Sequence, residues 1–429
     1  MPTPARRLAF QVLADVDRGG PTLGDRLAAA DVAVLDPRER GFLHELVLGT
    51  LRRRGEIDHA LTARLDRPLA QVQAPVVTAL RLGAYQILRL RVPARAAVSE
   101  SVELARAAVP RSAGFVNAVL RTLAREGAPA VPDPGADPLG WMTSAGSLPR
   151  WLAERWLARL GAEAALARAR ALLDAPSVAF RPNPRVSGAI DALAEAGLAP
   201  EPLSVPGAWS ASGSVPGELL EQGAAYVQEQ GSQMVGRLAA ARGSILDACA
   251  APGGKSTLMA DAAGDARTVI AAEAAPERAQ RLAALVARWG SPNVHVVRAD
   301  ARRPPFTRPF DVVLLDAPCT GLGTIGRNPD IRWRARPADL ERQAARQGAL
   351  LEALAPLVRG GGRLVYSTCS SEPEENEAVV AAFLERGAGR FVLEPLPEWA
   401  RPFASGPFAA TAPERGQGDA FFAALLRAV

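Results

Sequence analysis

Two cysteines lie in short polar turns, each directly after an apolar run that is typical of a strand. Cys319 ends the sequence DAPC, and Cys369 lies within STCS. A thiolate that adds to carbon 6 of a cytosine ring makes carbon 5 nucleophilic enough to take a methyl group, and a base must then remove the proton from carbon 5. One such cysteine is more often structural. Two of them in equivalent turns favour this covalent chemistry.

The other residue types that often carry chemistry form no pattern. The third cysteine, Cys249, has no CxxC spacing to the other two. The three histidines, His44, His59 and His295, are scattered along the chain. The sequence therefore predicts neither a metal site nor a disulfide framework.

A glycine-rich turn precedes both reactive cysteines. The sequence DACAAPGGKS, residues 247–256, follows a predicted strand and opens a predicted helix. Gly253 and Gly254 let the backbone approach a ligand, and the helix N-terminus offers unpaired N–H groups. Glu273 and Asp300 come at the ends of the next two predicted strands, where one carboxylate can accept ribose hydroxyls and the other can meet an adenine edge. Each acid alone would more often be a helix cap or a solvated loop residue, but their order on successive strands predicts a nucleoside site.

These turns all fall at strand ends of one predicted sheet. From residue 235 onward, short apolar runs alternate with helical segments, which is the pattern of a doubly wound α/β fold. Ligands in such folds bind beyond the carboxyl ends of the strands. The predicted strands are residues 244–248, 268–273, 294–298, 311–316 and 363–368, and the predicted helices are residues 256–263, 276–289, 337–358 and 374–386.

The chain is long enough for several domains. Its 429 residues exceed the roughly 250 at which single hydrophobic cores stop growing. Apolar residues recur at helical spacing through residues 1–127, which predicts an all-helical domain. A stretch rich in Pro, Gly and Ala predicts a linker at 128–146, and interrupted short segments predict a small α/β domain at 147–234. Residues 235–429 are predicted to form the doubly wound domain.

Composition limits the setting and the partners. With 48% hydrophobic and 22% charged residues, and no apolar run near the roughly 18 residues of a membrane span, the sequence predicts a globular cytoplasmic protein. Its start has no secretory pattern. The net charge of +5 is compatible with a polyanionic partner but too small to establish one. Lys255 is the only lysine in the chain, which suggests that its position resists exchange.

Four motifs together resemble one known family. They are DACAAPGGKS, LLDAPCTGLGTIGRNPDIRW, LVYSTCSSEPEENE and GDAFFAALL. Over the whole of 235–429 the chain resembles the bacterial Sun/Fmu, or RsmB-type, ribosomal RNA cytosine-5 methyltransferases, which implies a Rossmann-like class I methyltransferase domain. The helical residues 1–127, with AVSESVELAR and GFVNAVLRTL, resemble the NusB-like RNA-binding domain that the RsmB type carries.

The resemblance implies roles for individual residues. Cys369 would be the nucleophile, and Cys319 would assist proton removal and release. Asp316 would contact both the methyl donor and the cytosine ring, while Cys249 would do no chemistry. The donor would be S-adenosyl-L-methionine. The residues implied to hold it are Cys249, Ala250, Ala251, Pro252, Gly253, Gly254, Lys255, Glu273, Asp300 and Asp316.

The segment after the Pro-Cys turn is a candidate RNA-binding loop, although a salt-bridged surface loop fits its composition comparably well. The implied partner is small-subunit ribosomal RNA, and the target cytosine must leave any stack to reach a thiolate. We expect no membrane, no metal and a monomer. The candidate RNA contacts are Arg327, Asn328, Asp330, Arg332 and Trp333.

Two other functions compete with methyl transfer. Gly254-Lys255-Ser256 resembles the end of a P-loop, which would make the chain a nucleotide hydrolase, but Cys249 stands where that motif needs its first glycine. A non-catalytic RNA-binding or assembly factor would need only the NusB-like domain. Against this alternative, the two cysteine turns and the glycine-rich turn 247–256, called the donor loop from here on, are all intact.

Overall fold

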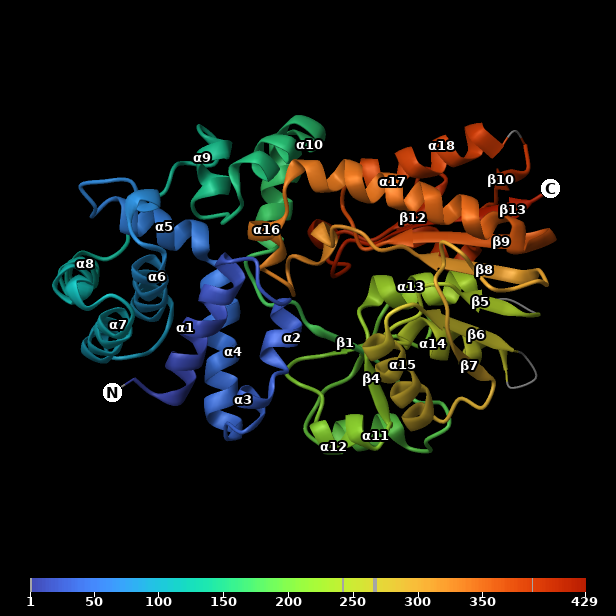
Figure 1. Ribbon diagram of the computed structural model, residues 1–429, viewed down its shortest axis with the longest axis horizontal. Helices are drawn as coiled ribbons and strands as arrows, with labels where there is room; N and C mark the ends of the chain where they lie inside the picture. The colour runs from blue at the N-terminus through green and yellow to red at the C-terminus, as the bar shows by residue number, and fades with distance from the viewer. Residues whose placement is uncertain (1, 241–242, 265–267, 388) are drawn as a thin grey trace. The chain divides into compact units, whose positions relative to one another are not determined.

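The computed structural model describes residues 2–240, 243–264, 268–387 and 389–429. The chain forms two compact units (Figure 1). Unit 1 consists of Met1–Ala175 together with Ile325–Ala335, and unit 2 consists of Pro176–Thr324 together with Arg336–Val429. The chain therefore leaves unit 2 after Thr324, contributes a short segment to unit 1, and returns to unit 2 at Arg336.

Unit 1 is helical, as the sequence predicts. On α8, the buried residues Val116, Val119, Leu120 and Leu123 recur at the spacing of one helix face. The central α6 is buried over most of its length, so the other helices pack around it. The helices are α1 (Pro4–Asp17), α2 (Leu23–Leu27), α3 (Ala30–Ala33), α4 (Pro37–Arg52), α5 (Arg54–Thr62), α6 (Ala74–Arg89), α7 (Ala94–Ala108), α8 (Ala113–Glu126), α9 (Pro138–Thr143), α10 (Arg150–Ala171) and α16 (Ile331–Arg334).

The structure divides the chain differently from the predicted boundaries. The expected linker, 128–146, contains α9, whose N-terminus is capped by Asp137 and whose Met142 is fully buried. A helix of this length is too short to show an apolar period. Of the expected middle domain, residues 147–175 belong to unit 1 and residues 176–234 to unit 2.

Unit 2 is built on a nine-stranded sheet whose path runs β11-β12-β13-β9-β8-β5-β6-β7, with β10 also pairing with β13. Strands β5 to β9 are parallel, and β13 is antiparallel to β9. The strand order reverses at β5 and β8, where a doubly wound sheet binds ligands. The strands are β5 (Ile245–Asp247), β6 (Val269–Glu273), β7 (Val294–Arg298), β8 (Phe310–Asp316), β9 (Val358–Thr368), β10 (Phe391–Leu393), β11 (Ala404–Ser405), β12 (Phe408–Ala410) and β13 (Phe422–Ala428).

Helices cover both faces of this sheet (Figure 1). Along β8, Val312 and Leu314 belong to one hydrophobic cluster, and Val313 and Leu315 to the other, because successive side chains of a strand point to opposite faces. One face packs against α13 (Gln230–Ala239), α14 (Gly254–Ala263) and α15 (Pro276–Trp289), and the other against α17 (Pro337–Leu354) and α18 (Glu377–Gly387).

A smaller sheet precedes the large one in unit 2. Its four strands are antiparallel and run in the order β2-β3-β1-β4. Phe180, Leu193 and Ala211 lie in its hydrophobic cluster. Its elements are β1 (Val178–Pro182), α11 (Ala189–Glu195), β2 (Glu201–Pro202), β3 (Trp209–Ala211), α12 (Gly217–Glu221) and β4 (Ala225–Val227).

Within the described ranges, no helix combines the length and the apolar character that crossing a membrane requires.

Candidate active site

The glycine-rich turn joins β5 to α14. Gly253 has a φ of +114°, a conformation that favours glycine. A Cβ at this position would lie 2.7 Å from Leu282 Cδ1, and a Cβ on Gly254 would lie 2.5 Å from Tyr226 Cε1. Both glycines are therefore needed for the turn to pass close to its neighbours.

The carboxyl ends of the parallel strands surround a cavity of about 260 Å³, the first of two at this site. Its walls include Glu273 at the end of β6, Asp300 after β7 and Asp316 at the end of β8. Cys319 and Cys369 line the same cavity. The structure thus brings together acids and cysteines that lie as far apart in the chain as Glu273 and Cys369.

Two of the carboxylates that line this cavity lie at the end of β6 and after β7, whereas the cysteine turns follow β8 and β9. Glu273 accepts the Ala275 N–H at 3.0 Å and pairs with Arg278 at 3.2 Å. Asp300 pairs with the Arg302 guanidinium at 2.7 Å, and this interaction lowers the pKa of Asp300 to about 2. Both side chains are acceptors, as the hydroxyls of a ribose and the amino group of an adenine require. Arg278 also lines the cavity and was not predicted from the sequence.

The two cysteine turns converge. Cys319 Sγ and Cys369 Sγ are 3.3 Å apart. The hydrogen bond between the sulfur atoms, followed by burial, raises the pKa of Cys319 well above its ordinary value. Cys319 therefore keeps its proton while Cys369 remains unreacted.

A buried carboxylate joins the two turns. Glu375 is fully buried, accepts the Thr320 N–H at 2.8 Å, and also accepts the hydroxyl groups of Thr320 and Ser370. Gln347 on α17 donates to Glu375 at 3.1 Å and to the Pro318 carbonyl at 3.0 Å. Each cysteine thus has a direct neighbour in the chain bonded to the same carboxylate. Sequence reasoning missed both Glu375 and Gln347, since an acid-rich SEPEENE segment is also typical of a helix start.

Lys255 and Asp316 form an ion pair beside the thiols. Lys255 Nζ lies 2.8 Å from Asp316 Oδ2, while Asp316 Oδ1 accepts the Ser367 hydroxyl at 2.8 Å. Burial by itself lowers the pKa of Lys255, but the neighbouring carboxylate outweighs it and the net direction is upward. The ammonium also lies 5.5 Å from the centre of the Phe421 ring. Asp316 is consequently held in one orientation by two donors.

A second cavity, of about 230 Å³, adjoins the first. The two share Cys249, Ala251 and Asp316 as lining residues. The second is also lined by the aromatic rings of Tyr226 and Phe421. Asp316 therefore lies between a cavity lined by carboxylates and one with aromatic walls.

The buried residues of the donor loop fit a positively charged ligand. Asp247 Oδ2 accepts the Ser256 hydroxyl at 2.7 Å, and Asp247 Oδ1, in the part of the chain that is described, has no hydrogen-bond partner. Burial raises the pKa of Asp247 to about 7. An unpartnered buried acceptor beside the second cavity suits the cationic methionine portion of S-adenosylmethionine. The Ser256 hydroxyl is buried and engaged by Asp247, which is unlike the metal-binding hydroxyl of a P-loop.

Cys249 lies in the donor loop but is poorly suited to nucleophilic chemistry. Burial, followed by the nearby Asp247 carboxyl, raises the pKa of Cys249 to about 12. A thiol with that pKa stays protonated at neutral pH.

The candidate RNA-binding loop belongs to unit 1, where two of its side chains have structural roles. Arg332 is fully buried and donates to the carbonyls of Ser147 at 3.1 Å and Ile325 at 2.9 Å. The Trp333 indole N–H donates to the Leu51 carbonyl at 2.8 Å. The prediction of an RNA contact must be corrected for Arg332, since a fully buried guanidinium cannot reach RNA in this conformation.

The remaining members of that loop differ in exposure. Asp330 is buried, and burial raises its pKa. Arg327 is half-buried and Asn328 is exposed. For Arg327, Asn328, Asp330 and Trp333 an RNA contact stays a prediction.

Known protein families and relatives match most of this chain. Residues 239–427 match the family described as 16S rRNA methyltransferase RsmB/F, and residues 3–125 match the NusB family. The probable ribosomal RNA small subunit methyltransferase B of Bacillus subtilis is 33% identical, with 92% of this chain and 91% of that protein covered. The ribosomal RNA small subunit methyltransferase B of Xanthomonas campestris is 36% identical, with 98% and 96% covered.

A solved structure is similar over its full length. The crystal structure of PH0851 matches with a TM-score of 0.81 and 25% identity, covering 99% of each chain. Together with the donor loop and the paired cysteine turns, these similarities show that the chain belongs to the 16S rRNA methyltransferase RsmB/F family, and so is an rRNA methyltransferase whose methyl donor is S-adenosylmethionine.

Proposed function

We propose that the protein methylates carbon 5 of a cytosine in small-subunit ribosomal RNA through a covalent adduct with Cys369. The observation that carries this proposal is the 3.3 Å separation of the Cys319 and Cys369 sulfur atoms in a cavity that also contains the donor-site acids. Methylation of a base nitrogen or a ribose oxygen has no need of two thiols, because those atoms are already nucleophilic.

Bound donor would supply the electrophilic methyl group, with its adenosine held by Glu273 and Asp300 in the first cavity. The methionine portion of the donor would extend toward the second cavity, beside Asp247. The base would enter the first cavity beside Cys319 and Cys369, where Asp316 offers an acceptor for ring or exocyclic N–H groups. Lys255 and Ser367 fix that acceptor in place. These residues orient the ring so that carbon 6 meets a sulfur atom and carbon 5 faces the donor.

The two thiols would act in sequence. The thiolate of Cys369 adds to carbon 6, which makes carbon 5 nucleophilic for methyl transfer. Bond formation at Cys369 removes the hydrogen bond that raises the pKa of Cys319 most, which favours release of the Cys319 proton to solvent. The Cys319 thiolate then takes the proton from carbon 5, and the bond between Cys369 Sγ and carbon 6 breaks to release 5-methylcytosine.

RNA containing 5-fluorocytosine tests the proposal, because fluorine cannot leave carbon 5 as a proton does. With S-adenosylmethionine, the full-length protein is expected to form a covalent complex, and peptide mapping is expected to find the modified base on Cys369. Methyl label recovered on another nucleoside, or a complex attached elsewhere, would contradict the proposal.

A further inference from the structure

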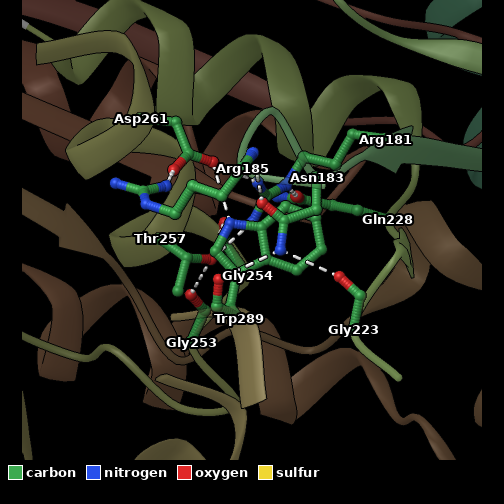
Figure 2. Close-up of polar contacts among 10 residues, drawn as sticks. All are labelled: Arg181, Asn183, Arg185, Gly223, Gln228, Gly253, Gly254, Thr257, Asp261 and Trp289. Atoms are coloured by element: carbon green, nitrogen blue, oxygen red, sulfur yellow. Dashed lines mark hydrogen bonds and ion pairs between the residues drawn. The ribbon is translucent and has the colours of Figure 1, made fainter. Parts of the chain in front are cut away.

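Arg181, on β1 of the small sheet, is buried beside the donor loop of the large one. The residue is only 4% exposed. The guanidinium lies 4.2 Å from the centre of the Trp289 ring. Figure 2 draws Arg181 and Trp289 with the surrounding polar contacts. Burial lowers the pKa of Arg181 to about 10, so the group is charged at neutral pH. A buried cation needs partners on all of its donors.

The donors of Arg181 reach different elements (Figure 2). Nε donates to Gln228 Oε1 at 2.9 Å, just after β4. One terminal nitrogen donates to Asp261 Oδ2 at 2.8 Å on α14. The other donates to the Gly254 carbonyl at 3.1 Å and to the Thr257 hydroxyl. The rigid guanidinium plane thus fixes the small sheet against the first turn of α14.

Both ends of this connection line the second cavity. Gln228 lines it from just after β4, and Gly254 lines it together with the donor-loop residues before it. The fit is tight, since a Cβ on Gly254 would lie 3.2 Å from Gln228 Cδ. A shift of the small sheet would therefore move the donor loop or open the cavity.

We propose that Arg181 is a positioning residue for methyl-donor binding, and that the small sheet acts through it as part of the donor site. Arg181 itself lines neither cavity, so it acts through the Gly254 carbonyl and the Thr257 hydroxyl. This inference rests on the use of S-adenosylmethionine by the family and is independent of which RNA atom is methylated.

Asn183 provides a matched control. It follows β1 by one residue, is 3% exposed, and donates to the carbonyls of Gly223 at 2.9 Å and Trp289 at 3.0 Å. These contacts stabilise the same region without touching the donor loop. Asn183→Ala should therefore lower stability and leave donor affinity unchanged.

The test measures S-adenosylhomocysteine binding by calorimetry in the full-length protein, without RNA, at a temperature where each variant is folded. Arg181→Met is expected to weaken binding by about ten- to a hundredfold, the range that loss of a charge-assisted hydrogen bond produces. Hydrogen exchange should rise in residues 250–257. Unchanged affinity in Arg181→Met would overturn the proposal, as would equal losses of affinity in Arg181→Met and Asn183→Ala.

Arg181→Lys decides the question if Arg181→Met does not fold. Lysine keeps the charge over Trp289 but cannot reach Gln228, Asp261 and Gly254 together. Reduced donor affinity in Arg181→Lys supports the positioning role, and wild-type affinity contradicts it. Because no RNA is present, failure of the cytosine mechanism would leave these results unchanged.

Discussion

Cys319 and Cys369 hold their sulfur atoms 3.3 Å apart although 50 positions separate them in the chain. The first prediction separates their roles. Cys369→Ala is expected to abolish methyl transfer, because it removes the thiol that is proposed to add to carbon 6. Cys319→Ala is expected to slow turnover by about 10²–10⁴-fold, the usual contribution of a positioned base.

Gel electrophoresis under denaturing conditions checks these roles with RNA and S-adenosylmethionine. Cys319→Ala should accumulate a protein–RNA adduct, because the carbon 5 proton stays in place and the adduct cannot break down. If the adduct accumulates in Cys369→Ala instead, the two roles are reversed.

The second prediction concerns Glu375, which bonds Thr320 and Ser370 beside the two cysteines. Glu375→Gln keeps the shape but replaces one acceptor oxygen with an N–H donor. It is expected to lower kcat by about tenfold or more, as displaced catalytic groups do, with donor affinity unchanged. Glu377→Gln, at an exposed position nearby, is the control and should match wild type. Equal kcat values in both variants would show that the thiols keep their places without Glu375.

The site geometry was predictable where it depends on the large sheet. Val312 and Leu314 are buried in a parallel strand that is covered on both faces, and such strands give apolar runs that a sequence displays clearly. Because neighbouring parallel strands end at the same edge, the turns holding Cys319 and Cys369 had to be close. The predicted strands accordingly match β5 to β9 within a few residues, except at the start of β9.

Buried polar contacts between distant segments were not predictable. Arg332 lies in a segment rich in charge, like many surface loops, yet its partner Ser147 is 185 positions away. Arg181 likewise depends on Asp261, 80 positions away. The sequence displays no period or spacing for such pairs, so their burial appears only when the units are folded.

The third prediction uses the fact that Lys255 is the only lysine. Its pKa lies above the ordinary 10.5 because Asp316 outweighs burial. In protein labelled with ¹⁵N-lysine, one side-chain signal should titrate above 10.5. In Asp316→Asn the same signal should titrate at a lower pH than in wild type, since the contributions of Asp316 that raise the pKa are lost while burial still lowers it. No downward change in that variant would contradict the ion pair.

The ion pair also has a consequence for stability. A lysine pKa that is raised in the folded state stabilises the protein fully below pH 10.5, and this contribution is lost as the pH rises through the folded-state value. As the pH rises to strongly alkaline values, the free energy of unfolding should therefore fall less in Asp316→Asn than in wild type.

The fourth prediction concerns Asp247, whose pKa is raised from 3.8 to about 7 by burial. Between these values the unfolded chain releases the proton and the folded chain keeps it, so this group makes stability fall as pH rises from about 4 to about 7. Asp247→Asn should remove that dependence. The difference in free energy of unfolding between Asp247→Asn and wild type, measured by urea denaturation, should favour the variant more at pH 8 than at pH 4. The change in this difference should be at most about 4 kcal/mol. A difference that stays constant with pH would contradict the raised pKa.

The last prediction separates structure from RNA binding within 325–335. Arg332→Met leaves buried carbonyls, including those of Ser147 and Ile325, without their donor, which should destabilise the protein by about 1–3 kcal/mol. Asn328 is exposed, so Asn328→Ala should change stability by less than about 0.5 kcal/mol. RNA affinity, measured by filter binding on folded samples, should be unchanged in Arg332→Met and reduced in Asn328→Ala. Reduced RNA affinity in Arg332→Met, with stability intact, would mean that the segment opens and presents its arginine to RNA.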